Sequence, residues 1–127
     1  MSGSIRASVS LGLNALAVSA AAQTPAPPPP VLVATARVVY VEVAPSEAGR
    51  TINVLKAYRL AAQKAPGAAH VAVLQQIGRP NLFAIHEKWN DGPSLQAHLA
   101  SADNTRLRGE LQSALLSPLD ERLMRLP

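Results

Sequence analysis

The sequence has no cysteine, few aromatic residues and few charged residues. Of its 127 residues, 3% are aromatic and 16% are charged, whereas 48% are hydrophobic. Without cysteine there can be no disulfide framework, cysteine-ligated zinc site, iron–sulfur cluster or thiol nucleophile. A core must therefore consist mainly of Ala, Val and Leu, and the position of each aromatic residue becomes informative. They are Tyr40, Tyr58, Phe83 and Trp89.

The charge is also too small and too dispersed to indicate a nucleic-acid partner. The net charge is +4, and the basic residues do not gather into a patch interleaved with aromatics, as single-strand binders require. At this length the chain has room for one ordinary domain. We therefore expect a single domain with a solvated, mildly basic surface and no nucleic-acid partner.

The first 22 residues have the order of a secretory signal. Arg6 precedes an uncharged run over residues 7–22, and small residues near Ala22 offer a cleavage site. The run is too short and too rich in Ala and Ser to span a membrane. The sequence therefore predicts a signal peptide over residues 1–22, a periplasmic or secreted product, and no membrane span in the mature chain. A poorly ordered N-terminus is the alternative.

Prolines mark the next segment. Five of the eleven prolines lie between residues 25 and 30, and we interpret residues 23–34 as an extended proline-rich linker. A ligand for a proline-recognition domain is the alternative. Residues 35–127 then form the domain.

The remaining chain alternates between strand-like and helix-like patterns. Val-rich and alternating segments predict strands, and apolar residues at helical spacing predict helices. Ser46 is placed as the N-cap of the first helix, Pro66-Gly67 after its end, and a break near residues 101–103 inside the second helical segment. The predicted order is a strand over 31–43, a helix from 46, strands over 69–77 and 82–89, a helical segment from 93 to 118, and a strand over 119–126.

A β-α-β-β-α-β order in about 90 residues is typical of a ferredoxin-like α+β sandwich, with both helices on one face of an antiparallel sheet. The other face of the sheet would then be bare. Because soluble monomers rarely expose a large apolar patch, we expect two sheets to pack face to face in a homodimer.

The two middle strands also predict a pairing. A turn over residues 78–81 would place opposite one another residues whose numbers sum to 159. His70 would then face Trp89 on the side of the helices, while His86 would lie on the dimer side. The other predicted pairs are Gln76 with Phe83, Leu74 with Ile85, and Ala72 with Glu87.

Several of these residues together resemble a known family. They are Tyr40-Val-Glu-Val, Tyr58, Pro66-Gly67, Phe83 to Trp89, Asp91, His98 and Ser101. Over residues 35–126 the chain resembles the antibiotic biosynthesis monooxygenase family, a group of dimeric α+β barrels. The most specific element is Glu87-Lys88-Trp89 followed nine residues later by His98.

The resemblance implies a chemistry. Family members include oxygenases of quinols and polyketide anthrones that use no metal or flavin, haem-degrading enzymes and isomerases. In such oxygenases a deprotonated phenolic substrate itself reduces dioxygen, while the pocket supplies orientation and a base. We therefore expect an oxidoreductase that oxidises a small quinol- or anthrone-like aromatic, with no cofactor and no metal.

The resemblance also suggests residues for the site. Trp89 would stack on a flat substrate, and His70 or His98 would accept the proton, so the expected catalytic set is His70, Trp89 and His98. Tyr40, Tyr58, Phe83 and Glu87 would bind the substrate. Each has a structural alternative: packing for the aromatics and histidines, and an ion pair with an arginine such as Arg59 for Glu87.

Some family features are missing. The polyketide-type oxygenases carry an asparagine where this chain has Ile85 and a tyrosine where it has Leu95, and haem-degrading members carry an asparagine on the first strand, which residues 37–43 lack. Haem degradation and isomerisation are therefore the lesser alternatives. The main alternative to an oxygenase is a barrel that binds a small apolar ligand without turnover.

Overall fold

The computed structural model describes residues 24–27 and 32–127, and Val31–Pro127 is one compact unit. The predicted signal peptide and most of the predicted linker lie outside the described residues, so export stays a prediction. Residues 24–27 and 32–34 form neither helix nor strand. No helix among the described residues is long and apolar enough to cross a membrane.

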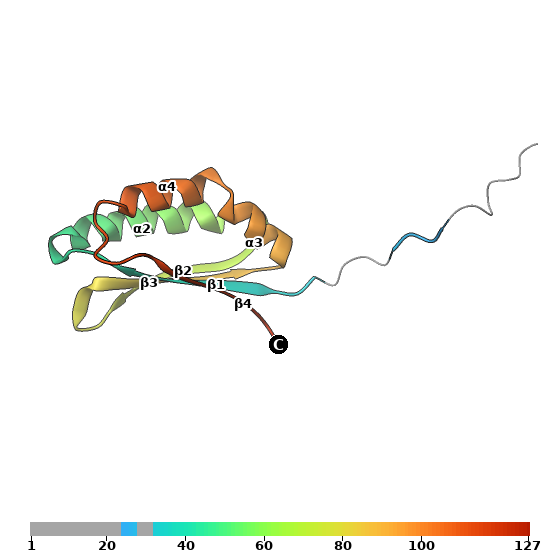
Figure 1. The fold of residues 1–127 in the computed structure, drawn as a ribbon, viewed down its shortest axis with the longest axis horizontal. Helices are drawn as coiled ribbons and strands as arrows, with labels where there is room; N and C mark the ends of the chain where they lie inside the picture. Colours follow the sequence, from blue (N-terminus) through green and yellow to red (C-terminus); the bar gives the residue numbers. More distant parts are fainter. Residues whose placement is uncertain (1–23, 28–31) are drawn as a thin grey trace, which may run out of the picture. The chain divides into compact units, whose positions relative to one another are not determined.

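Four strands form one antiparallel sheet. They are β1 (Thr35–Glu42), β2 (Ala68–Gln76), β3 (Arg79–Trp89) and β4 (Asp120–Arg125), in the spatial order β2-β3-β1-β4. Three helices and a short 3-10 turn complete the fold: η1 (Pro45–Glu47), α2 (Ala48–Gln63), α3 (Gly92–Leu99) and α4 (Ala102–Leu111). The helices cover one face of the sheet (Figure 1). The predicted ferredoxin-like α+β fold is confirmed.

Capping side chains explain where the second helical segment is interrupted. Asp91 accepts a hydrogen bond from the Ser94 amide and begins α3, and Ser101 accepts one from the Asn104 amide and begins α4. The predicted break near residues 101–103 is therefore confirmed. The predicted cap at Ser46 is wrong: Ser46 lies inside η1, and Glu47, which precedes α2, makes no side-chain cap.

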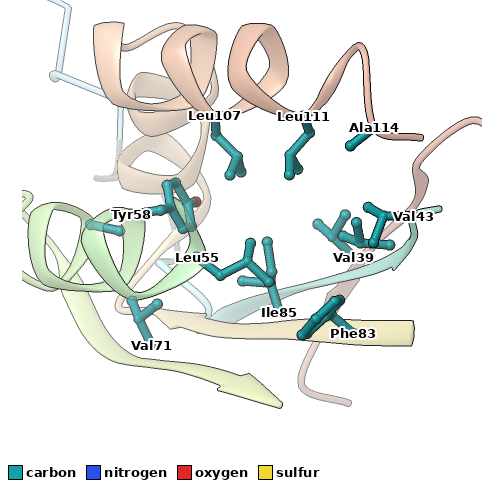
Figure 2. Close-up of a cluster of buried hydrophobic side chains, with 12 residues drawn as sticks. Val39, Val43, Leu55, Tyr58, Val71, Phe83, Ile85, Leu107, Leu111 and Ala114 are labelled. Carbon is teal, nitrogen blue, oxygen red and sulfur yellow. The ribbon is translucent and has the colours of Figure 1, made fainter. Parts of the chain in front are cut away.

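An aliphatic core fills the space between the helices and the sheet (Figure 2). Strands β1 and β3 contribute the alternate residues that point toward the helices, as the period of two requires. Leu55 and Tyr58 from α2 and Leu107 and Leu111 from α4 close over them. The sheet residues in this core are Val39, Val41, Val43, Val71, Phe83 and Ile85.

The predicted pairing of β2 with β3 is wrong by one residue. His70 pairs with Lys88 and Ala72 with His86, so paired numbers sum to 158 over most of the ladder. The turn is shorter than predicted because it contains Ile77 and Gly78, and Gly78 adopts the left-handed φ of +84°. Residues 79–81 instead belong to β3, and the register shifts after Gln75.

The one-residue shift exchanges the two faces of β2. Val71 is buried under the helices, while His70 is exposed on the face of the sheet that carries no helix. We call this surface the open face. On β3 the predicted faces are confirmed, with Phe83, Ile85, Glu87 and Trp89 buried. The open face comprises Ala36, Val38 and Tyr40 of β1, His70, Ala72 and Leu74 of β2, Ala84, His86 and Lys88 of β3, and Asp120, Arg122 and Met124 of β4.

Candidate functional site

Two opposite charges lie on the buried face of the central strands. Arg37 on β1 is paired in register with Glu87 on β3, and both are almost fully buried, with 0% and 1% of their surface exposed. Nη1 of Arg37 donates to Oε2 of Glu87 over 3.2 Å. A buried charge needs such compensation because it has lost its hydration. Strand alternation and antiparallel register together therefore bring these two side chains into one layer.

The guanidinium of Arg37 links four elements to β1. Nη1 also donates to the Tyr58 hydroxyl on α2 (3.1 Å), and Nη2 donates to Oδ1 of Asn104 on α4 (2.9 Å) and to Oε2 of Glu121 on β4 (3.3 Å). Burial favours a lower pKa for Arg37, but the negative charges around it, led by Glu87, outweigh burial and raise the pKa. The side chain is thus a fixed cation that ties the helices to the sheet.

Tyr58 lies between Glu87 and His98. Its hydroxyl donates to Oε2 of Glu87 and lies 2.7 Å from Nε2 of His98 on α3. Burial, aided by the negative charge of Glu87, raises the pKa of Tyr58 far above its ordinary value of 10.0. Tyr58 therefore stays a neutral phenol that can donate one hydrogen bond and accept others.

His98 is buried with one ring nitrogen unpartnered. Its ring stacks on Trp89, with centroids 4.6 Å apart and planes at 29°. Nδ1 has no hydrogen-bond partner among the described residues. Burial lowers the pKa of His98 below its ordinary value of 6.5; Arg37 lowers it further, whereas Glu87 and Asp103 oppose this. At neutral pH the imidazole is therefore uncharged and able to accept a proton.

A cleft of about 720 Å³ adjoins His98. It lies between the C-terminal end of α2 and the starts of α3 and α4, and most of its walls are small or flat side chains. Its lining residues are Ala61, Lys64, Ala65, Pro66, Pro93, Ser94, Ala97, His98, Ser101 and Asp103. We call this depression the His98 cleft. Through it a small molecule could approach His98. A smaller depression of about 70 Å³ adjoins Tyr58 between α2 and α4. We call the hydrogen-bonded side chains behind His98 the buried polar cluster; they are Arg37, Tyr58, Glu87, Trp89, His98, Asn104 and Glu121.

A glycine lies beside two residues that line the His98 cleft, Pro66 and Ser94. Gly67 follows α2 with a left-handed φ of +83°, and a Cβ at this position would overlap the side chain of Ser94. Its carbonyl accepts a hydrogen bond from the Asn90 amide over 2.8 Å. Glycine is therefore required twice at this position, for its backbone conformation and for the close approach of α3.

Four of the predicted site residues come together, and three do not. Tyr58, Glu87, Trp89 and His98 form one cluster. Phe83 belongs to the hydrophobic core between the helices and the sheet, whereas Tyr40 and His70 lie on the open face. The predicted proximity of His70 to Trp89 is wrong because β2 is shifted by one residue.

The environment of Trp89 also differs from the sequence-based expectation. Its side chain is fully buried, its indole N–H donates to Oε1 of Glu87 over 3.0 Å, and one ring face is covered by His98. In this structure the indole therefore packs on the imidazole and does not form an exposed wall for a flat substrate.

Three members of the buried polar cluster were not predicted from the sequence: Arg37, Asn104 and Glu121. The structural alternative for Glu87, an ion pair with an arginine, is confirmed, but the arginine is Arg37 and not Arg59, which donates to the carbonyl of Val71. One signal was available: Arg37 shares a strand face with Val39, Val41 and Val43, so it needed a buried carboxylate. Among the described residues no group of three His, Cys, Asp or Glu side chains could hold a metal ion.

Comparisons with known proteins give one family and several similar folds. The family model described as antibiotic biosynthesis monooxygenase matches residues 35–108. A search of curated proteins gives no match. Many solved structures are similar, and the three described next are similar at identities that support the fold alone.

Three of these structures illustrate the likeness. A Bacteroides thetaiotaomicron protein described as a possible oxidoreductase is 19% identical, with 76% of this chain and 100% of that one covered and a TM-score of 0.69. A conserved protein from Methanosarcina mazei is 22% identical, with 76% and 95% covered and a TM-score of 0.70. A structure described as an antibiotic biosynthesis monooxygenase is 16% identical, with 73% and 98% covered and a TM-score of 0.68.

Proposed function

Because the chain belongs to the antibiotic biosynthesis monooxygenase family, we propose that it oxidises a small quinol- or anthrone-like aromatic with dioxygen and needs no metal or flavin. The observation that carries this proposal is His98: a neutral, buried imidazole at the His98 cleft, with Nδ1 free of any internal partner. Nδ1 itself exposes almost no surface, so a substrate in the cleft would reach it once the side chains around His98 move aside. A basic nitrogen without an internal partner is suited to general-base catalysis on a phenolic or similarly acidic aromatic substrate.

The reaction balances without an external reductant. The base removes a proton from the substrate, and the resulting anion is electron-rich enough to transfer electrons to dioxygen. For an anthrone, the ring CH₂ and one O₂ become C=O and H₂O, so the substrate supplies all four electrons. The protein contributes orientation in the cleft and a proton acceptor at His98.

The walls of the His98 cleft support a flat, mainly apolar substrate. Alanine and proline side chains make the walls of the cleft smooth, and Lys64 and Asp103 supply one charge of each sign. Pockets for small molecules commonly combine apolar walls with a few polar groups that fix orientation. The acidic proton of the substrate would be directed to Nδ1, the ring nitrogen that makes no hydrogen bond to Tyr58.

The test is oxygen consumption with a panel of quinols and anthrones. We expect uptake with at least one compound, reduced about a hundredfold in His98→Gln, in line with the usual contribution of a general base. His70→Gln is the matched control because His70 lies on the open face, on the other side of the sheet from His98, and its rate should stay close to that of the wild type. Equal rates in His98→Gln and the wild type would contradict the assignment of His98.

One observation favours the second candidate function, ligand binding without turnover. Both oxygens of Glu87, the Trp89 indole and the Tyr58 hydroxyl are engaged with one another and with Arg37. A cluster satisfied internally in this way has few groups to offer a reacting molecule. Absence of uptake across the panel, together with binding of its members detected by a shift in melting temperature, would support this function instead.

We also propose that two copies pair through the open face. Tyr40, Leu74 and Met124 expose 46%, 49% and 47% of their surface there, without a helix to cover them. Apolar side chains gathered on one bare sheet face are typical of an interface. Two sheets in face-to-face contact would form the barrel that the family resemblance implies.

A further inference from the structure

We propose that Glu87, acting through the Tyr58 hydroxyl, is a positioning residue that fixes the tautomer of His98 so that Nδ1 carries the free lone pair. This inference rests on the proposed function for its catalytic meaning, but its structural content can be measured without any substrate. The arrangement is a chain of three side chains from three elements: β3, α2 and α3.

Counting protons fixes the direction of each hydrogen bond in the chain. Glu87 is a carboxylate paired with Arg37 and has no proton to give, so the Tyr58 hydroxyl must donate to it. Tyr58 has a single proton, and Nη1 of Arg37 already donates to its oxygen. The contact of 2.7 Å between Tyr58 and His98 therefore requires that Nε2 of His98 supply the proton.

The assignment of Nε2 as the protonated nitrogen leaves Nδ1 as a bare acceptor. This agrees with its lack of any partner, since an unpartnered N–H donor buried at the same place would leave a hydrogen bond unmade. If Nδ1 takes a proton from a substrate, the ring becomes an imidazolium that keeps its Nε2 bond to Tyr58. Only the substrate's proton moves, and it ends on Nδ1.

The groups around His98 also determine how readily it accepts that proton. Glu87 on β3 and Asp103 on α4 favour the imidazolium, and Arg37 on β1 opposes it; Tyr58 on α2 is neutral. Glu87 therefore has two effects: it orients the Tyr58 hydroxyl, and its charge stabilises the protonated ring. Removal of the charge at Glu87 should lower the proton affinity of His98.

The test is ¹⁵N nuclear magnetic resonance of the histidine rings in the full chain without substrate. The three histidines are assigned with His70→Gln and His86→Gln. We expect the neutral His98 ring to be protonated at Nε2, with a hydrogen-bonded Hε2 resonance that exchanges slowly with water. In Tyr58→Phe this resonance should be lost, whereas in Glu87→Gln the ionisation of His98 should move to lower pH.

Thr51→Val is the matched control for Tyr58→Phe. It also removes a buried hydroxyl from α2, but Thr51 Oγ1 has no hydrogen-bond partner. His98 should be unaffected by this change. Glu87→Gln is nearly isosteric and leaves Arg37 paired with Glu121, so it keeps the proposal testable if Tyr58→Phe does not fold.

Two results would overturn the inference: a neutral His98 protonated at Nδ1, or an Hε2 resonance and titration unchanged in both Tyr58→Phe and Glu87→Gln. Oxygen uptake with an active substrate separates this from the proposed function. There, Glu87→Gln should lower kcat at least about tenfold and shift the acid limb of the pH profile to lower pH, with little change in KM. A wild type without uptake but with the expected resonances would contradict the oxygenase and leave the hydrogen-bond chain standing.

Discussion

The imidazole of His98 covers one face of the Trp89 indole, with the ring centroids 4.6 Å apart. A molecule that enters through the His98 cleft would therefore meet the imidazole before the indole. The tryptophan instead holds the histidine in place, since its N–H is fixed by Glu87. This stack, together with the bond from His98 to Tyr58, restrains the ring on two sides.

Loss of the buried guanidinium of Arg37 should lower the free energy of unfolding by several kcal/mol. Arg37→Met leaves the buried carboxylate of Glu87 without its cation, whereas Glu121 keeps Arg108. Breaking a buried ion pair in this way usually costs about 3–5 kcal/mol. The free energy of unfolding can be measured with urea at fixed protein concentration, with the fluorescence of Trp89, the one tryptophan of the chain, as the signal.

Arg108→Met is the control for this measurement. Arg108 also pairs with Glu121, but 45% of its side chain is exposed, so its loss should cost less than about 1 kcal/mol. Equal costs for the two variants would contradict the role assigned to Arg37.

Stability should depend on pH through His98. Its pKa is lowered in the folded state, so below pH 6.5 the unfolded chain binds the proton more readily. The contribution of His98 to the free energy of unfolding should therefore be constant above this pH and should fall as the pH drops below about 6.5. Urea unfolding at a series of pH values measures the slope.

The histidine variants identify the source of that slope. His98→Gln should reduce it, whereas His86→Gln, on the open face, should retain it. A slope that is the same in His98→Gln and the wild type would assign the pH dependence to other groups.

Two glycines allow the cost of a clash to be separated from the cost of backbone strain. Gly67 and Gly78 have nearly the same φ, +83° and +84°, but a Cβ would meet a neighbour, Ser94, only at Gly67. Each Gly→Ala change should cost about 1 kcal/mol from the left-handed backbone, and Gly67→Ala should cost more. Adding Ser94→Gly should remove most of the difference between the two. If both alanine variants lose equal stability, the close packing at Gly67 is not as described.

Oligomeric state tests the open face. Leu74→Lys should shift the protein from dimer to monomer in sedimentation experiments, because each copy would bury one charged lysine between the two sheets. Leu60→Lys is a matched control, since Leu60 is also exposed but lies on α2, on the opposite side of the sheet. A wild type that sediments as a monomer would contradict the pairing.

The sequence was sufficient for the order of elements and for one face of the sheet. Ser101 and Asp91 are capping residues, and a helix break near them could be predicted from residue type. On β3 the alternation of Phe83, Ile85 and Glu87 with smaller or charged residues identifies the buried face.

For β2, the sequence did not determine which face of the strand is buried under the helices. Val71 and Val73 alternate with Ala72 and Leu74, so both faces are apolar, and the register depends on the turn. Because Pro80 and Asn81 resemble turn residues, the sequence favoured a longer loop, whereas the chain turns at Ile77 and Gly78. The longer loop placed His70 on the side of the helices, opposite Trp89, whereas the shorter turn places it on the open face, opposite Lys88.

The buried polar cluster was predicted in part for a different reason. Tyr58, Glu87 and His98 were found through a motif, but Arg37 gathers partners 21, 50, 67 and 84 residues away in the sequence. Local patterns carry no information about such separations. Only the assembled sheet and helices bring these groups together.

The strand order has a consequence for how the chain acquires its fold. β1 is the earliest strand along the sequence, yet both of its neighbours, β3 and β4, come from the second half. During synthesis β1 therefore has no strand to pair with on either edge until β3 and β4 have been made. Arg37 likewise has no carboxylate partner until Glu87 and Glu121 have been added. Non-local pairing of this kind slows folding and leaves strand edges open to other chains, so the period before β3 docks is when the newborn protein is most prone to aggregate.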